Sequence, residues 1–205
     1  MEGLEKIFEA AELLFRKYGI RSVSMSDISA ALGMSKKTLY QYIDNKNDLI
    51  EKIMFNYISV EKENTLSISE KSVNALDEMM KISFHVQKNL ENLNPVLLFD
   101  LKKYHFDIWK HFNEYHYDFI QKLIVRNLEK GKEEGIYRTD INAEIISRIH
   151  VSSIEIFADD RLLPPENFPR IDIHKEFVMY HLHGILSEKG RTLFYEYQYQ
   201  QSKYI

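Results

Sequence analysis

One short stretch of the sequence, residues 36–42, gathers side chains that can bind phosphate groups and the edges of nucleic-acid bases. The stretch carries lysines, hydroxyl groups and an amide but no carboxylate. These side chains are Lys36, Lys37, Thr38, Tyr40, Gln41 and Tyr42. Ammonium and hydroxyl groups bind phosphate oxygens, and lysine and glutamine also match the major-groove edges of guanine and adenine. The chemistry that this stretch favours is contact with a phosphate-lined major groove.

Local signals predict short helices that position these side chains. Ser24 and Asp27 have the spacing of a capping box at the start of one helix, and Ser35 is placed to cap the next. Gly33, between the two helices, permits a sharp turn at no steric cost. The predicted helices span residues 4–18, 25–32 and 36–43. Two helices joined by a three-residue turn that contains glycine form a helix-turn-helix pattern.

The segment from Ala11 to Ile53 resembles the DNA-binding domain of the TetR family of transcriptional regulators. The most specific part of the resemblance is the run Gly33-x-Ser35-x-x-Thr38-Leu39-Tyr40-x-Tyr42. Two positions depart from the usual family pattern, because Ser29 stands where alanine is usual and Ile43 where phenylalanine is usual. Both positions are predicted to lie in the core of the three helices, so the departures concern packing.

The resemblance implies a role for each polar residue of the segment. Four residues are expected to hold phosphates, namely Thr38, Tyr40, Tyr42 and Lys46. Lys37 and Gln41 are the best candidates to contact base edges, while Lys36 could contact either a base or a phosphate. Ser24 and Ser26, near a helix start, are expected to add a phosphate contact. The predicted DNA-binding set is Ser24, Ser26, Ser35, Lys36, Lys37, Thr38, Tyr40, Gln41, Tyr42 and Lys46.

The same residues also have structural alternatives. Lys36 and Lys37 could be an ordinary solvated pair, and Tyr40 could be a core tyrosine. The formal net charge of the chain is −4, and residues 1–50 carry seven basic and seven acidic side chains. A helical protein-interaction module without DNA binding is therefore the alternative function. Steep weakening by salt would distinguish DNA binding from protein docking.

The remainder of the chain predicts an all-α fold with two domains, a helix-turn-helix domain at 1–46 and a helical effector-binding and dimerisation domain at 47–205. Only seven glycines and four prolines interrupt 205 residues with many stretches of helical periodicity. A long helix is expected to begin near Lys46, and loops are expected at Thr65–Ser69 and Asp159–Ile171. The further predicted helices span residues 72–92, 95–104, 106–130, 142–158, 173–189 and 191–201.

Aromatic side chains and histidines gather in the middle of the chain. They are typical of the core of a helical bundle, and they would equally suit a pocket for an apolar or aromatic effector. The residues predicted to line such a pocket are Phe84, His85, Phe99, Trp109, Phe112 and His116.

The predicted helices at 142–158 and 173–189 are apolar over much of their circumference and carry small residues. Two copies of this helix pair could form a four-helix bundle across a two-fold axis, which makes a homodimer. The alternative is burial of both helices within one subunit. The predicted interface residues are Ile149, Ser153, Ile156, Phe177, His181, Gly184 and Ile185.

Other classes of function lack a signal. The histidine spacings, such as His111/His116 and His181/His183, do not share a helix face as metal ligands would, and cysteine is absent. No nucleophile elbow, phosphate loop or dinucleotide fingerprint is present, so neither catalysis nor a cofactor is expected. No apolar run approaches the roughly 18 residues of a membrane span, and the first residues lack the features of a signal peptide. A cytoplasmic location is expected.

The resemblance implies a ligand-responsive regulator. The expected mechanism is a repressor that binds a palindromic double-stranded operator as a homodimer and is released by a small-molecule effector. An activator would have the same sequence features, because the sign of regulation depends on where the operator lies.

Overall fold

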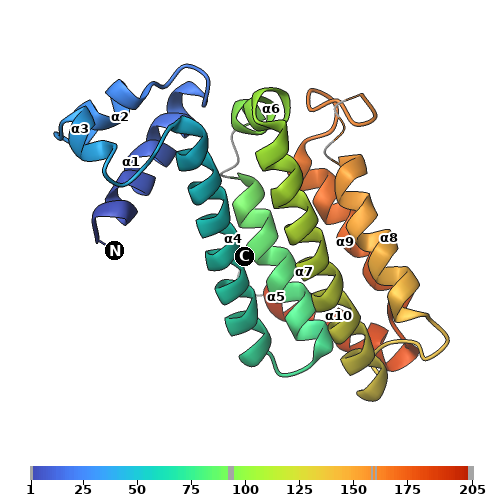
Figure 1. Cartoon of the computed structure of the whole chain (residues 1–205). Helices are drawn as coiled ribbons and strands as arrows, with labels where there is room; N and C mark the ends of the chain where they lie inside the picture. Colours follow the sequence, from blue (N-terminus) through green and yellow to red (C-terminus); the bar gives the residue numbers. More distant parts are fainter. Residues whose placement is uncertain (1, 92–94, 158, 160, 203–205) are drawn as a thin grey trace. The chain divides into compact units, whose positions relative to one another are not determined.

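The computed structural model describes residues 2–91, 95–157, 159 and 161–202. In these residues the secondary structure is helical, with helices joined by turns and loops (Figure 1). One isolated bridge joins Tyr137 to Leu186, and the described residues form no strand. The all-α prediction is therefore confirmed. The helices are α1 Glu2–Tyr18, α2 Met25–Ala31, α3 Lys36–Leu39, α4 Lys46–Glu70, α5 Ala75–Glu91, α6 Pro95–Tyr104, α7 Phe106–Glu133, α8 Ala143–Phe157, α9 Arg170–Ile185 and α10 Glu188–Ser202.

Packing divides the helices into two units. The first unit contains α1, α2, α3 and α6, together with α4 up to Glu63 and α7 up to His116. The second unit contains α5, α8, α9 and α10, together with the remaining parts of α4 and α7. This division is one of packing, and the functional boundary predicted between residues 46 and 47 stays a prediction.

A continuous apolar core holds the first unit together. Ile7, Ala11 and Phe15 recur at helical spacing along one face of α1, and all three are buried. They pack in one cluster with residues from α2, α3, α4 and α6. The buried residues from these partner helices are Met25, Ile28, Leu39, Leu49, Ile50, Ile53 and Leu101. Each such side chain stabilises the unit by about 1.5–3 kcal/mol through removal of apolar surface from water.

Buried polar contacts from the end of α7 and the turn that follows it fix the start of α5 in the second unit. The backbone N–H of Ala75 donates to the Glu134 carboxylate at 2.7 Å, which satisfies one unpaired group of the first helical turn. The carbonyl of Ala75 accepts from Asn127 Nδ2 at 2.9 Å and from the Tyr137 hydroxyl at 3.0 Å. The ring of Tyr137 is only 1% exposed and lies directly over Gly131 of α7.

We expect Gly131→Ala to destabilise the second unit strongly, because a Cβ at this position would overlap the ring of Tyr137. Overpacking of a rigid buried site costs about 3 kcal/mol of unfolding free energy. Urea denaturation at fixed protein concentration measures the change. Gly33→Ala is the control: Gly33 has φ +63° but open space around it, so its cost should be only about 1 kcal/mol. Equal costs at the two sites would contradict this account of Gly131.

The predicted loop at Thr65–Ser69 is wrong, because α4 continues through it to Glu70. Thr65 is buried, and the Ser69 hydroxyl donates to the carbonyl of Thr65 at 3.0 Å. The hydroxyl of Ser72 donates in the same way to the carbonyl of Ile68 at 2.7 Å. Short polar side chains, which favour loops in isolation, are thus satisfied on the helix backbone.

The predicted helix at 173–189 is also corrected, since α9 begins at Arg170 and ends at Ile185. Leu186 has extended dihedral angles and forms the bridge to Tyr137, which separates α9 from α10. Among the described helices, none is both long enough and apolar enough to cross a bilayer.

Candidate DNA-binding interface

The start of α2 is fixed by the predicted capping box. Ser24 N–H donates to Asp27 Oδ2 at 2.7 Å, and Asp27 N–H donates to Ser24 Oγ at 3.2 Å. Hydrogen bonds from the Ser24 side chain and backbone lower the pKa of Asp27 below its ordinary value. Gly19, in the connection from α1, has the left-handed conformation (φ +79°) that the sequence predicts for the end of that helix.

The turn between α2 and α3 is also as predicted. Gly33 has φ +63°, and Met34 N–H donates to the carbonyl of Ser29 at 3.0 Å. Ser35 caps α3, because its Oγ accepts from Thr38 N–H at 3.1 Å. The hydroxyls of Ser35 and Thr38 also lie 2.9 Å apart in a hydrogen bond.

The third helix is shorter than the predicted 36–43. Its α-helical part is Lys36–Leu39, and the chain continues in turns, with Gln41 N–H donating to Thr38 O at 3.2 Å. Leu39 and Ile43 are completely buried and anchor this segment on the first core. The departure of Ile43 from the usual family residue is thus a matter of packing.

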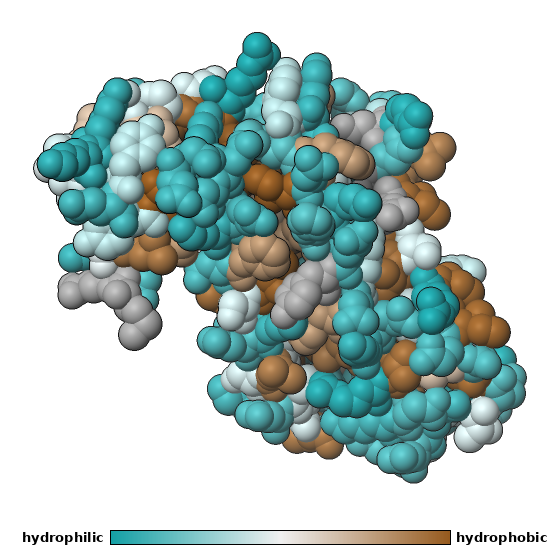
Figure 2. Space-filling model, viewed as in Figure 1, coloured by the Kyte–Doolittle hydropathy of each residue, from teal (hydrophilic) through white to brown (hydrophobic). Residues whose placement is uncertain are grey.

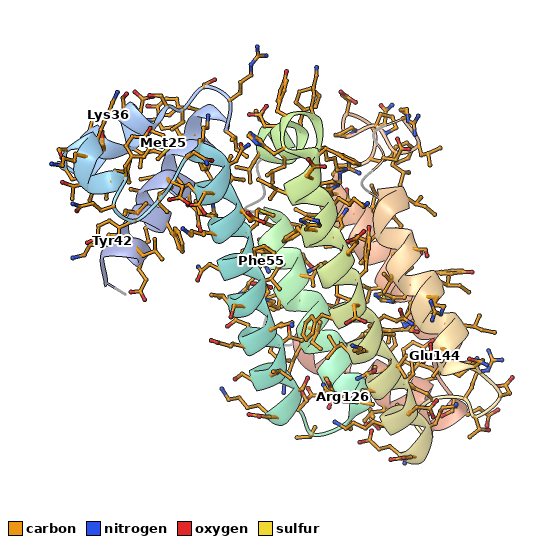
Figure 3. All side chains as sticks on the ribbon, in the orientation of Figure 1. Met25, Lys36, Tyr42, Phe55, Arg126 and Glu144 are labelled. Atoms are coloured by element: carbon orange, nitrogen blue, oxygen red, sulfur yellow. The ribbon has the colours of Figure 1, made fainter. Side chains whose placement is uncertain are left out.

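The outer surface of this segment is open to solvent. Figure 3 labels Lys36 and Tyr42, the first and last residues of this segment, and Lys37 and Gln41, which lie between them in the sequence, are exposed. Tyr40 and Tyr42 are 47% and 46% exposed, and Thr38 is half-buried. The ring of Tyr42 also packs on Gly3 of α1, where a Cβ would lie 3.1 Å from its hydroxyl oxygen. Most of the predicted groove-binding side chains of residues 36–42 are therefore accessible to solvent, and their contact with DNA stays a prediction.

Lys46 stands apart from that set. Its Nζ donates to the carbonyl of Ile20 at 2.5 Å, which ties the start of α4 to the connection between α1 and α2. Burial lowers the pKa of Lys46, although the carboxylates of Asp100 and Asp27 act in the opposite direction. The bond to Ile20 occupies one of the three N–H donors of Lys46, so a phosphate contact by the other two stays a prediction.

Two acidic side chains near the interface, Asp27 and Asp48, accept local hydrogen bonds. Asp27 serves the α2 cap, and Asp48 accepts from Asp44 N–H at 2.9 Å and from Lys52 Nζ at 2.8 Å. Of these two carboxylates only Asp48 forms an ion pair with a described residue, Lys52, whereas Asp27 keeps its charge at the α2 cap; the lysines of α3 are exposed.

The predicted pocket residues fall in both units. Phe84 and His85 belong to the second unit, and the other four belong to the first. Phe112 stacks between Trp109 and His116, with ring-centroid distances of 5.7 and 5.4 Å. Burial lowers the pKa of His116. Phe99 is 54% exposed and makes an edge contact with Tyr104 instead.

A narrow apolar crevice beside Phe112 in the first unit is too small to admit a water molecule. It has no polar lining, and Figure 3 labels one of its walls, Phe55. The residues that line it are Met54, Phe55, Ile58, Ile108 and Phe112. The sequence prediction named Phe112 but none of the α4 residues, because they come from a different part of the chain.

The predicted interface residues of α8 and α9 differ in exposure. Three are exposed, namely Ile149, Ile156 and Gly184. Ser153 and Phe177 are half-buried, whereas His181 and Ile185 are buried inside the second unit. Sequence periodicity missed Tyr180, which is 79% exposed on α9. Figure 2 shows hydrophobic surface along the edge where α8 lies.

The comparisons with known proteins agree with this geometry. Residues 7–53 match the model for bacterial regulatory proteins of the tetR family. Residues 7–53 are therefore a DNA-binding domain of the TetR family of transcriptional regulators. A Bacillus subtilis relative, the uncharacterized HTH-type transcriptional regulator YvaF, is 28% identical over 172 residues, which cover 82% of this chain and 88% of the relative.

Solved structures of transcriptional regulators share the fold. The regulator from Haloarcula marismortui superposes with a TM-score of 0.74 at 16% identity, over 91% of this chain and 99% of that one. A regulator from Saccharomonospora viridis, solved in complex with choline, gives 0.66 at 17% identity, over 91% and 99%. The family model and the curated relative that match this chain are both those of transcriptional regulators. The described residues of the chain contain no group of three or more side chains placed to hold a metal ion.

Proposed function

We propose that this chain is a homodimeric repressor that binds a palindromic operator and is released by an apolar or aromatic small molecule. The observation that carries the DNA part is the exposed surface of residues 36–42. Lys37 and Gln41 are exposed while Leu39 and Ile43 are buried, so the segment is anchored on one side and accessible on the other. Repression needs only that a bound dimer blocks the promoter, whereas activation would require a further surface for RNA polymerase.

The proposal makes a specific prediction for Lys37 and Gln41. We expect Lys37→Ala and Gln41→Ala each to weaken operator binding by about 1–3 kcal/mol, or roughly 5- to 150-fold, and to relax the choice of base at one position of each half-site. Fluorescence anisotropy on a site selected from random-sequence duplexes measures both effects.

Lys122→Ala is the matched control for the loss of one positive charge, since Lys122 is an exposed α7 lysine of the second unit. It should leave affinity and base preference unchanged. If the α3 variants behave like Lys122→Ala, this segment does not enter the groove. If the wild type shows no salt-dependent affinity for any duplex, a protein-interaction module would be the better proposal.

The dimer part of the proposal is supported by a ridge on α8. Ile145, Ile149 and Ile156 are 56%, 56% and 49% exposed and recur at helical spacing with the exposed Ser152. A row of large apolar side chains on the surface of one subunit is typical of a protein contact. Across a two-fold axis the same ridge would meet its own copy, and two recognition segments would face successive major grooves about 34–36 Å apart.

The effector part is supported by the stacked rings of Trp109, Phe112 and His116, beside which a narrow apolar crevice would have to open to admit a ligand. Rings and methyl groups suit an apolar or aromatic ligand. Such a ligand releases DNA only if it binds the DNA-free arrangement more tightly than the bound one. The α4 helix belongs to both units, so it is the covalent path by which a shift could reach the DNA-binding helices. Release of the labelled operator by added aromatic compounds tests this part.

A further inference from the structure

An exposed group of cations and aromatic rings lies in the first unit outside the helix-turn-helix. It consists of Arg21, Phe99, Lys103 and Tyr104, which we call the cation–aromatic surface. Arg21 Nη1 donates to the Tyr104 hydroxyl at 3.0 Å, and its guanidinium lies 5.0 Å from the centre of the same ring. Lys103 Nζ lies 4.9 Å from the ring of Phe99 and 5.5 Å from that of Tyr104. The two rings meet edge to face.

The two cations of this surface are positioned but not neutralised. Arg21 and Lys103 are both exposed, and neither forms an ion pair with a described residue. The carboxylate of Asp100 on α6 is 5% exposed and accepts from the backbone N–H of Arg21 at 3.0 Å. Aromatic faces hold a cation in place while leaving its charge available to an outside partner.

The cation–aromatic surface adjoins the start of α2. Arg21 precedes the N-cap residue Ser24 by three positions, and its backbone bond to Asp100 fixes this connection on α6. Figure 1 shows α6 beside the connection between α1 and α2, and α6 packs on α1. Arg21 therefore lies on the connection that leads into the helix-turn-helix, close in sequence to the predicted phosphate contacts Ser24 and Ser26. Lys103 lies on the α6 helix to which this connection is bound.

We infer that the cation–aromatic surface is a second DNA contact, which binds the phosphate backbone beside each half-site without selecting bases. The inference rests on the proposed DNA-binding function and adds a site to it. The positive charge of the surface favours a polyanionic partner. Because the surface lies beside the helix-turn-helix, the polyanion within reach is the same DNA duplex. Because both cations are already held by rings, little side-chain entropy is lost when they meet phosphates.

The experiment compares a selected operator duplex with a scrambled duplex of equal length. The double variant Arg21→Ala, Lys103→Ala should weaken binding of both duplexes by the same factor, about tenfold or more, and leave their affinity ratio unchanged. Each lost phosphate contact lowers the slope of log affinity against log salt by about 1, so a dimer should lose about 4. Hydroxyl-radical footprinting should show protected backbone positions that disappear in the variant.

Tyr104→Phe refines the test, because it keeps the ring and removes only the hydroxyl that holds Arg21. A smaller, equal loss on both duplexes is expected, while circular dichroism and the melting temperature stay those of the wild type. Unchanged affinity and salt slope in the double variant would overturn the inference while the operator binding of the wild type still stands. A change in base preference would also overturn it, and failure of the wild type to bind any duplex would overturn both proposals.

Discussion

Replacement of Ile149 by glutamate should convert the dimer into monomers and weaken operator binding at least about 100-fold. Ile149 is 56% exposed at the middle of the α8 ridge, so glutamate is harmless in an isolated subunit. At a two-fold interface, however, two carboxylates would be buried close together without partners, at a cost of several kcal/mol. A monomer can occupy only one half-site, so the contribution of the second half-site to binding is lost. Analytical ultracentrifugation and fluorescence anisotropy measure the two effects.

Val73→Glu provides the control for this substitution. Val73 is 78% exposed at the turn before α5 and does not belong to the α8 ridge. The same change of an exposed aliphatic residue to glutamate should leave both the mass of the dimer and its affinity for DNA unaltered. A fully dimeric Ile149→Glu protein with wild-type affinity would show that subunits associate through another surface.

The helix-turn-helix was predictable because its signals are local. A capping box, an N-cap serine and a glycine with positive φ each depend on residues within three positions of one another. Ser24, Gly33 and Ser35 therefore adopt the predicted conformations. The length of α3 was less predictable. Leu39 and Ile43 have the spacing of a helix face, but they are also both buried when turns follow the helix after Leu39.

Contacts between distant residues were not predictable. The bond from Lys46 to the carbonyl of Ile20 spans 26 positions, and the bond from Arg21 to Tyr104 spans 83. No pattern in the sequence pairs these residues. The sequence therefore predicts a phosphate contact for Lys46, as for its neighbours, and predicts no role for Arg21.

Periodicity also could not distinguish the two faces of an apolar helix. On α9 both the inner and the outer faces carry large side chains, so the sequence selected the buried His181 and Ile185 and missed the exposed Tyr180. On α8 the predicted interface residues Ile149 and Ile156 are exposed in the single subunit, and their contact with a second subunit stays a prediction. The partner of a face is a property of the tertiary structure, and helical spacing specifies only which residues share that face.

The second large effect that we expect is a loss of stability in mild acid, caused by a pair of histidines in the second unit. The rings of His150 on α8 and His181 on α9 meet edge to face at 4.6 Å, and Phe177 packs against both. His150 Nδ1 and His181 Nε2 are buried and have no hydrogen-bond partner among the described residues. Burial lowers the pKa of His150 to about 3, helped by His181 and His174, and lowers that of His181 to about 4.

These pKa values set the direction and the range of the effect. In the unfolded chain both histidines bind protons near pH 6.5, whereas the folded protein keeps them neutral. Stability is therefore complete above pH 6.5 and decreases as the pH falls toward the folded pKa values. At pH 5 each histidine should cost about 2 kcal/mol, or about 4 kcal/mol together. Carboxylates with lowered pKa, such as Asp27 and Asp48, stay ionised above pH 5 and do not contribute.

Urea denaturation at pH 7.5, 6 and 5, at one protein concentration, measures this loss. His181→Leu keeps an apolar side chain in the same space and should remove about half of the decrease between pH 7.5 and 5. His111→Leu changes an exposed histidine of α7 and should leave the decrease intact. A flat profile for the wild type would mean that the pair is protonated in the native state. An unchanged profile for His181→Leu would assign the acid sensitivity to other groups, such as His116 or His174, whose pKa values burial also lowers.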